Sequence, residues 1–339
     1  MTAAIRPSPL RVLIACHAGA TIGLGHLARA LVLARALRDQ LGAAVELLIQ
    51  GDVVERPDLQ AFSHRFIRME ADLAAAITQA CQEAGTQLMV MDLHPQYHPS
   101  DLAATLAALR RHGCRCIGVD THQQTELLDL LFIPSFRTPP GASPDGTPPV
   151  LSGWDCFLLG VPPPTRTSWR PDSDVLVLTG GSDPTGLGKT LPAQLNDRLA
   201  AKTRIDWVSG PYAAPPSFPS VPRVSFVQHR APPCLDNLMD RASYALAVYG
   251  VSFYELLYYG VPTVVFSPYG DKDDAELAIV EAEGVALTAR NAEEAVERLH
   301  MLMQDEALAQ RLSQRTRARM AARGEEKFIH VVATLMGEA

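Results

Sequence analysis

The stretch ATIGLGHLARALVLARAL, residues 20–37, decides how the fold begins, because it joins a strand to a helix through a glycine-rich turn. The apolar run RVLIAC at 11–16, directly before it, predicts a buried strand. Four apolar residues recur at helical spacing behind the turn: Leu27, Leu31, Ala34 and Leu37. His26 therefore stands where the chain leaves a strand and enters a helix, and open α/β sheets bind their ligands beyond the carboxyl ends of strands.

The turn itself suits a ligand and a base. Gly23 and Gly25 allow a close approach of the backbone or a positive φ, and the start of a helix offers unpaired amides with partial positive charge. An imidazole at this position is mostly neutral at neutral pH and can accept a proton, so His26 is a candidate general base. The alternative is an ordinary glycine turn before a helix, with His26 exposed to solvent.

Composition narrows the class of protein. With 339 residues, 47% of them hydrophobic, the chain can bury two cores, so we expect two domains. The net charge is −7 and the basic residues are scattered, which excludes a track for nucleic acid. No apolar run is long enough to span a bilayer, and the N-terminus leads directly into the first strand without a secretion signal. We expect a cytoplasmic protein.

The cysteines have neither the spacing of a zinc site nor that of a disulfide framework. They are Cys16, Cys81, Cys114, Cys116, Cys156 and Cys234. Cys114 and Cys116 lie two apart on a predicted strand, with both side chains on one face. We expect reduced, structural thiols, and no metal or other cofactor.

Strand and helix patterns alternate through both halves of the chain. In the first half the further strands are expected at 45–49, 88–91, 116–119 and 130–133, with helices near 72–84 and 101–112. In the second half they are expected at 174–178, 204–209, 224–226, 244–247, 263–266 and 285–287, with a helical tail from 292. Such alternation predicts parallel sheets covered on both faces.

A proline-rich segment at 134–171 separates the halves, and its proline density excludes a regular helix or a central strand. We therefore expect an α/β fold with two doubly wound, Rossmann-like domains, 1–165 and 166–339, facing each other across a cleft. The last helices are expected to pack back on the first domain.

The segment TGGSDPTG, 179–186, is a second glycine-rich turn that follows a predicted strand. Gly180, Gly181 and the hydroxyl of Ser182 could cradle a phosphate or a ribose there. The alternative is a tight turn in which Asp183 caps the turn that follows.

The segment VYGVSFYELLYYGVPTVVF, 248–266, indicates a ligand site more specifically than the previous segment does. Gly250 and Ser252 open a helix that carries Glu255 in its first turn. Ser252 and Glu255 also have the spacing of a capping box, a structural role that could exclude ribose binding by Glu255.

Taken together, IGLGHLAR, GGSDP and the G-x-S-x-x-E run followed by G-x-P resemble the UDP-sugar hydrolases of the pseudaminic acid pathway. Those enzymes are similar to nucleotide-sugar glycosyltransferases of the GT-B fold, and the resemblance runs from residue 10 to the C-terminal helices. It implies that His26 activates water against the anomeric carbon, inverting it and releasing UDP. Arg29 matches the arginine three positions later in the motif.

The resemblance also implies a nucleotide site in the second domain. The residues implied to line the nucleotide and its diphosphate are Gly180, Gly181, Ser182, Gly250, Val251 and Ser252. Glu255 would hold the ribose hydroxyls. Unpaired helix amides stabilise a diphosphate, and a carboxylate accepts hydrogen bonds from two vicinal hydroxyls.

Two segments that carry candidate residues depart from the hydrolase pattern. SPYGDKDDAE places Lys272 and Asp273 in the substrate site, and it resembles the transferase that adds N-acetylglucosamine to the murein lipid precursor. MDLHPQY keeps Asp92 and adds His94, both candidate catalytic residues at a strand end. His122 ends another strand, where a structural role is favoured.

The leading function is inverting cleavage of a UDP-sugar, in the biosynthesis of surface polysaccharide or nonulosonic acid. The first alternative is a GT-B glycosyltransferase, in which His26 deprotonates an acceptor hydroxyl, with peripheral membrane contact if the acceptor is a lipid carrier. The second is a non-catalytic subunit that binds nucleotide sugars.

Overall fold

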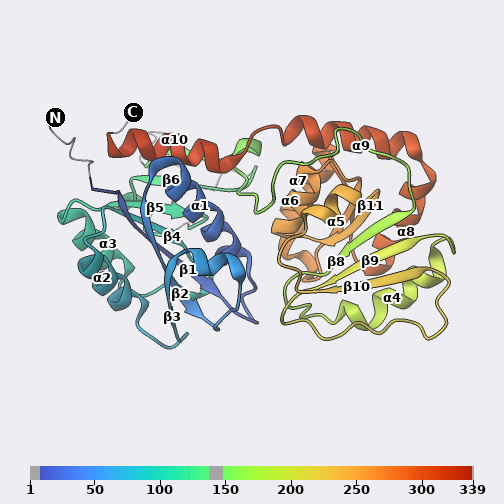
Figure 1. Cartoon of the computed structure of the whole chain (residues 1–339), viewed down its shortest axis with the longest axis horizontal. Coiled ribbons are helices and arrows are strands. Elements are labelled where there is room, and N and C mark those ends of the chain that lie inside the picture. The colour runs from blue at the N-terminus through green and yellow to red at the C-terminus, as the bar shows by residue number, and fades with distance from the viewer. Residues whose placement is uncertain (1–7, 122, 137–147, 338–339) are drawn as a thin grey trace, which may run out of the picture. The chain divides into compact units, whose positions relative to one another are not determined.

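The computed structural model describes residues 8–121, 123–136 and 148–337 (Figure 1). Contacts within the chain divide it into two compact units. The first comprises Met1–Gly160 together with Arg323–Ala339, and the second is Val161–Ala322. His122 lies outside the described residues, as does much of the proline-rich segment.

The first unit contains a parallel sheet of seven strands in the order β3-β2-β1-β4-β5-β6-β7. The strands are β1 (Arg11–Ala18), β2 (Ala44–Gly51), β3 (Ser63–Ile67), β4 (Leu88–Asp92), β5 (Arg115–Val119), β6 (Leu130–Phe132) and β7 (Val150–Leu151). The strand order reverses direction between β1 and β4, where Cys16 lies opposite Asp92. Ligands of doubly wound sheets bind at such a switch point.

Helices cover both faces of this sheet. They are α1 (Gly25–Leu41), α2 (Leu73–Ala84), α3 (Leu102–Arg111) and α10 (Gly324–Met336). Apolar side chains of α2 and α3 pack with Leu13, Met89 and Leu131 on one face. The neighbouring Phe132 points to the other face and meets Phe328 of α10, with ring centroids 5.3 Å apart. The helix α10 also packs against α1 (Figure 1).

Three strand predictions need correction in the first unit. β1 continues two residues beyond Cys16, so His17 belongs to the strand. β3 was not expected, because SHRFI is an edge strand with partly exposed side chains and no apolar run. β7 lies within the proline-rich segment, but at the edge of the sheet, where proline-rich sequence is tolerated.

The second unit contains a parallel sheet of six strands in the order β10-β9-β8-β11-β12-β13. The strands are β8 (Asp174–Leu178), β9 (Arg204–Ser209), β10 (Ser225–Arg230), β11 (Tyr244–Val248), β12 (Thr263–Phe266) and β13 (Leu287–Ala289). β10 extends four residues beyond the expected strand end at 226, and β13 lies two residues later than expected. The switch point of this sheet lies between β8 and β11.

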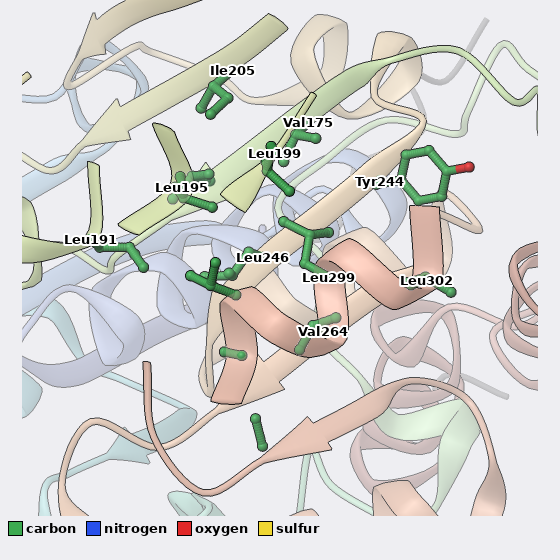
Figure 2. Packing of buried hydrophobic residues seen from close by; sticks show 14 of the residues in the cluster. Val175, Leu191, Leu195, Leu199, Ile205, Tyr244, Leu246, Val264, Leu299 and Leu302 are labelled. Carbon is green, nitrogen blue, oxygen red and sulfur yellow. The ribbon is translucent and has the colours of Figure 1, made fainter. Parts of the chain in front are cut away.

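Six helices described in this unit surround its sheet. They are α4 (Leu187–Arg198), α5 (Asp236–Arg241), α6 (Val251–Tyr258), α7 (Asp274–Glu283), α8 (Ala292–Gln304) and α9 (Glu306–Arg319). Figure 2 shows the core, in which Leu195 of α4, Leu199 directly after it and Leu299 of α8 pack with strand residues such as Leu246 and Val264. Burial of such side chains removes apolar surface from water and stabilises the unit.

The structure adds two general observations. No helix among the described residues is long and apolar enough to cross a membrane. The six cysteines are all described and all are free thiols, with Cys234 exposed and the other five buried.

Candidate functional site

Asp92 is the centre of a polar cluster at the switch point of the first sheet. It ends β4, and its carboxylate is fully buried. The Nδ1 atom of His26 lies 2.6 Å from Asp92 Oδ1. Arg29 donates from Nε to Oδ2 at 2.8 Å and from Nη2 to Oδ1 at 2.7 Å. Three candidate residues that are 3 and 63 positions apart in sequence thus form one hydrogen-bonded group.

This contact decides how His26 can act. An ionised carboxylate only accepts hydrogen bonds, so Nδ1 of the neutral imidazole carries the proton and donates it to Asp92. Nε2 then keeps its lone pair. The side chain of His26 is 13% exposed, so it is held by its surroundings yet still reachable. The arrangement is that of a general base oriented by a carboxylate.

The charges around Asp92 keep it ionised. Burial raises the pKa of the Asp92 carboxyl, but Arg29 and His26 beside it outweigh burial and bring that pKa down to about 2. Burial lowers the pKa of Arg29, and the neighbouring Asp92 and Asp120 carboxylates raise it overall. The pair is therefore charged at neutral pH.

Asp120 is a member of the cluster that sequence reasoning missed. It follows β5, and its Oδ2 lies 3.4 Å from Nη1 of Arg29. Its backbone has φ of 52°, in the left-handed region that residues other than glycine seldom adopt. The signal in the sequence is a carboxylate directly after a strand, as for Asp92.

His17 was also missed, although it lies between the predicted strand at 11–16 and the glycine-rich turn. Its buried ring accepts a hydrogen bond at Nδ1 from the His94 backbone N–H, at 2.8 Å. Its Nε2 therefore carries the proton and faces Gln50 Oε1 at 3.1 Å. Burial lowers the pKa of His17 to about 4, so the ring is neutral and positions the chain around His94.

His94 lies beside His26, as its place after β4 suggested. The two ring centroids are 5.7 Å apart, and the Tyr97 ring centroid lies 5.3 Å from that of His94. The Nδ1 atom of His94 accepts from the Gln96 backbone N–H, so the neutral ring carries its proton on Nε2. In that tautomer Nε2 of His94 is a hydrogen-bond donor.

The glycine turn before α1 is ordered by its own hydrogen bonds. The backbones of Gly19 and Gly23 pair with each other, and the Asp52 carboxylate accepts from the Ala20 N–H at 2.7 Å. Gly23 has φ of +86°, which explains a glycine there, and Gly25 is the first residue of α1. The turn places His26 in the first turn of the helix.

The first glycine loop of the second unit lies at its switch point. A Cβ on Gly180 would lie 3.5 Å from Val248 Cγ2, at the end of β11. The Gly181 carbonyl accepts from the Tyr212 N–H, and Ser182 is half-buried. Asp183 accepts from the amides of Leu187 and Gly188, both at 2.8 Å. The start of α4 is therefore already capped, which matches the alternative interpretation of this segment.

The second loop leaves its helix start open. α6 begins at Val251, directly after Gly250, and no described side chain caps it. The predicted capping box is wrong, because Ser252 is already the second helical residue. A Cβ on Gly250 would meet nothing within 4 Å in the described parts of the chain. Glu255 lies one turn further on the buried side of α6.

Lys272 and Asp273 belong to the segment after β12. The ammonium group of Lys272 lies 5.0 Å from the centre of the Tyr269 ring, and Asp273 accepts a hydrogen bond from Ser267 at 2.6 Å. Burial raises the pKa of Tyr269, as do Asp273 and Asp183 nearby. Lys272 is therefore the exposed cation of this loop, while Asp273 braces it.

Metal ligands do not gather in the part of the chain that the structure describes: no three His, Cys, Asp or Glu side chains there are placed to hold an ion.

Comparison with known proteins yields matches in structure. No family model matches the sequence, and the comparison with curated proteins finds no match. UGT2 of Phytolacca americana, complexed with UDP-2-fluoro-glucose and pterostilbene, matches with a TM-score of 0.65 at 14% identity, covering 96% of this chain and 99% of that one. MurG of Acinetobacter baumannii matches with a TM-score of 0.65 at 16% identity, covering 96% and 100%. The spinosyn forosaminyltransferase SpnP matches with a TM-score of 0.66 at 12% identity, covering 97% and 100%.

The chain has the GT-B fold. Its two α/β units, with parallel sheets of seven and six strands, agree with these matches over nearly its whole length. The fold predicted from the sequence is thereby confirmed. At 12–16% identity the likeness reaches the GT-B fold and no further.

Proposed function

We propose that this protein transfers a glycosyl group from a nucleotide sugar to an acceptor hydroxyl, with inversion at the anomeric carbon. The observation that carries the proposal is the 2.6 Å contact between His26 Nδ1 and Asp92 Oδ1, because it leaves Nε2 of His26 to take a proton. A base held in this way serves to activate a weak nucleophile.

In the proposed step, the acceptor oxygen attacks the anomeric carbon while the bond from that carbon to the diphosphate breaks. The acceptor proton goes to His26 Nε2, and the nucleoside diphosphate leaves with the bonding electrons. A single displacement of this kind inverts the anomeric centre. Asp92 stabilises the imidazolium that forms, and Arg29 keeps Asp92 ionised.

The donor is assigned to the glycine loops of the second unit. The open start of α6, at Gly250, Val251 and Ser252, offers unpaired amides and partial positive charge to a diphosphate. Glu255, one turn later, would accept hydrogen bonds from the ribose hydroxyls. The start of α4 is a poorer phosphate site, because Asp183 occupies its amides.

The names of the matched structures favour transfer over hydrolysis. One was solved with UDP-2-fluoro-glucose and pterostilbene, and another is a forosaminyltransferase. UDP is accordingly the first nucleotide to test.

Hydrolysis is the second candidate, supported by the sequence resemblance to the UDP-sugar hydrolases of the pseudaminic acid pathway. Water would then take the place of the acceptor at the same base. A non-catalytic subunit is disfavoured, since such a protein has no need of a histidine held by a buried carboxylate.

The test is to incubate the purified protein with UDP- and CMP-sugars, with and without hydroxyl acceptors, and to follow free nucleotide. Transfer predicts release that depends on an acceptor and is lost in His26→Ala. Release of nucleotide that is equally fast without an acceptor supports hydrolysis. If no nucleotide sugar binds, the proposal is overturned.

A further inference from the structure

A cavity of about 310 Å³ opens in the first unit beside the histidine cluster. One wall is the chain that follows β3, including Asp72, and the other runs from Tyr97 to Asp101. The Tyr97 ring lies 5.3 Å from His94, whose ring lies 5.7 Å from His26. The cavity is therefore two ring contacts away from the proposed base.

Resting on the transfer proposed above, we propose that this cavity binds the part of the acceptor that lies away from the reacting hydroxyl. We propose further that this part is a neutral or amine-bearing ring about the size of one sugar. Ligand cavities in proteins usually span about 300 to 1,000 Å³. This cavity lies at the lower end of that range, which suits a single ring.

The charge of the lining selects against anions. Asp72 and Asp101 contribute carboxylates, and the described residues that line the cavity include neither lysine nor arginine. Tyr97, His98 and Ser100 add hydroxyl and imidazole groups suited to hydroxyls of a ligand. A phosphorylated or carboxylated acceptor would be repelled here, whereas an ammonium group would be attracted.

Asp101 is the residue best placed to hold such a group. It precedes α3 at the N-cap position, yet its carboxylate makes no hydrogen bond to that helix or to any other described residue. Asp72, at the equivalent position before α2, differs because it accepts from the Ala75 N–H at 3.0 Å. Asp101 thus occupies an N-cap position without capping the helix through its side chain, and its carboxylate oxygens are open to a ligand.

The opposite wall is rigid. The amide of Gln50 donates to the carbonyl oxygens of Met69 and Ala71, both at 3.0 Å, and its Oε1 faces the buried His17. Because these bonds are already formed, a ligand would not have to order this wall on binding. The same lining mixes polar and apolar side chains and, among the described residues, includes neither lysine nor arginine, unlike a groove for a lipid carrier.

The test is binding of sugars without donor, by saturation-transfer NMR. Protonated glucosamine and methyl glucoside are expected to bind, and glucuronate is not. Asp101→Asn should weaken glucosamine about tenfold or more, because it removes a charge-assisted hydrogen bond. Asp172→Asn is the matched control: it removes the same charge from an exposed residue of the second unit, and it should bind like the wild type.

Binding of glucuronate as strong as that of glucosamine would overturn the proposal, as would an Asp101→Asn protein that binds glucosamine normally. In the transfer assay, Asp101→Asn should raise the acceptor KM and leave kcat nearly unchanged. A protein that binds these sugars as expected and transfers nothing would instead overturn the proposed function, with the ligand class of the cavity still supported.

Discussion

The carboxyl ends of the strands carry different groups in the two sheets: charged side chains in the first unit, and mainly backbone in the second. In the first unit, Asp92 is fully buried between two cationic or protonatable partners, and the neutral ring of His17 fixes the chain beside it. In the second unit the same edge consists mainly of backbone, with Gly180 and Gly250 facing open space or an apolar neighbour. In the first unit, the charged groups at this edge are side chains of the protein itself. The second leaves room for a ligand to supply them.

The largest effect on this contrast is expected from removing the base. His26→Ala should lower the rate of acceptor-dependent nucleotide release by about 10²- to 10⁴-fold, the usual contribution of a positioned base. Nucleotide binding should be unchanged, because His26 belongs to the other edge. His330→Ala, which removes an exposed histidine of α10, is the matched control. Retention of the full rate by His26→Ala would remove the base from the account.

Neutralising Asp92 should cost stability as well as rate. Asp92→Asn leaves Arg29 without its buried partner, which costs about 3 to 5 kcal/mol of unfolding free energy at neutral pH. Asp39→Asn, which breaks the exposed pair with Arg38, should cost less than about 1 kcal/mol. Urea unfolding measures both. Equal losses in the two variants would show that the first edge is no more tightly built than the surface.

Acid should bring the unfolding free energy of the wild type closer to that of the same Asp92→Asn variant. The pKa of Asp92 is about 2 in the folded protein, below its ordinary value near 3.9. Its contribution to stability is therefore present above the ordinary value and is lost as pH falls towards about 2. The difference in unfolding free energy between wild type and Asp92→Asn should shrink over that interval. A constant difference would contradict the ionised carboxylate.

His17 gives a pH dependence of the same sign in a higher range. Its folded pKa is about 4, below the ordinary 6.5, so the unfolded chain binds more protons between these values. Stability should fall as pH drops from about 6.5 to 4, by on the order of 3 kcal/mol in full. His17→Gln removes this titration, so its unfolding free energy should vary less over that interval. Parallel curves for the two proteins would show that His17 is not held neutral.

The smallest effect is expected at the second edge. Gly250→Ala adds a methyl group where the described chain leaves 4 Å free, and an extended φ of 161° suits alanine. The unfolding temperature should stay the same, because no contact is lost. UDP affinity should fall about tenfold, which corresponds to about 1.4 kcal/mol, if the diphosphate approaches this backbone. Undiminished UDP binding would move the donor away from α6.

Sequence patterns predicted the strands at the centres of both sheets, because fully buried parallel strands read as continuous apolar runs. They missed β3, whose side chains are half exposed, and they placed the start of α6 differently from the structure. A shift of two residues was enough to turn Ser252 from a predicted cap into a helical residue. Helix ends are the least certain part of any such prediction.

The candidate site was also predicted only in part from the sequence. His26 stood at a helix start and Asp92 at a strand end, and these positions marked them. Arg29 was implied only by the resemblance to the hydrolases. Their contact could not be read from the sequence, since Asp92 follows His26 by 66 positions and only the pairing of β1 with β4 joins them. His17 escaped notice because β1 was expected to end at Cys16, two residues before its actual end.

The central claim is that Asp92 acts on the reaction through His26, and a double-mutant cycle tests it most directly. The rate of acceptor-dependent UDP release is measured for His26→Ala, Asp92→Asn and the double variant, each corrected for its folded fraction. Residues that act as one unit give strongly non-additive effects. The account predicts that Asp92→Asn slows the wild type but causes no further loss once His26 is alanine. Two losses that multiply would contradict it.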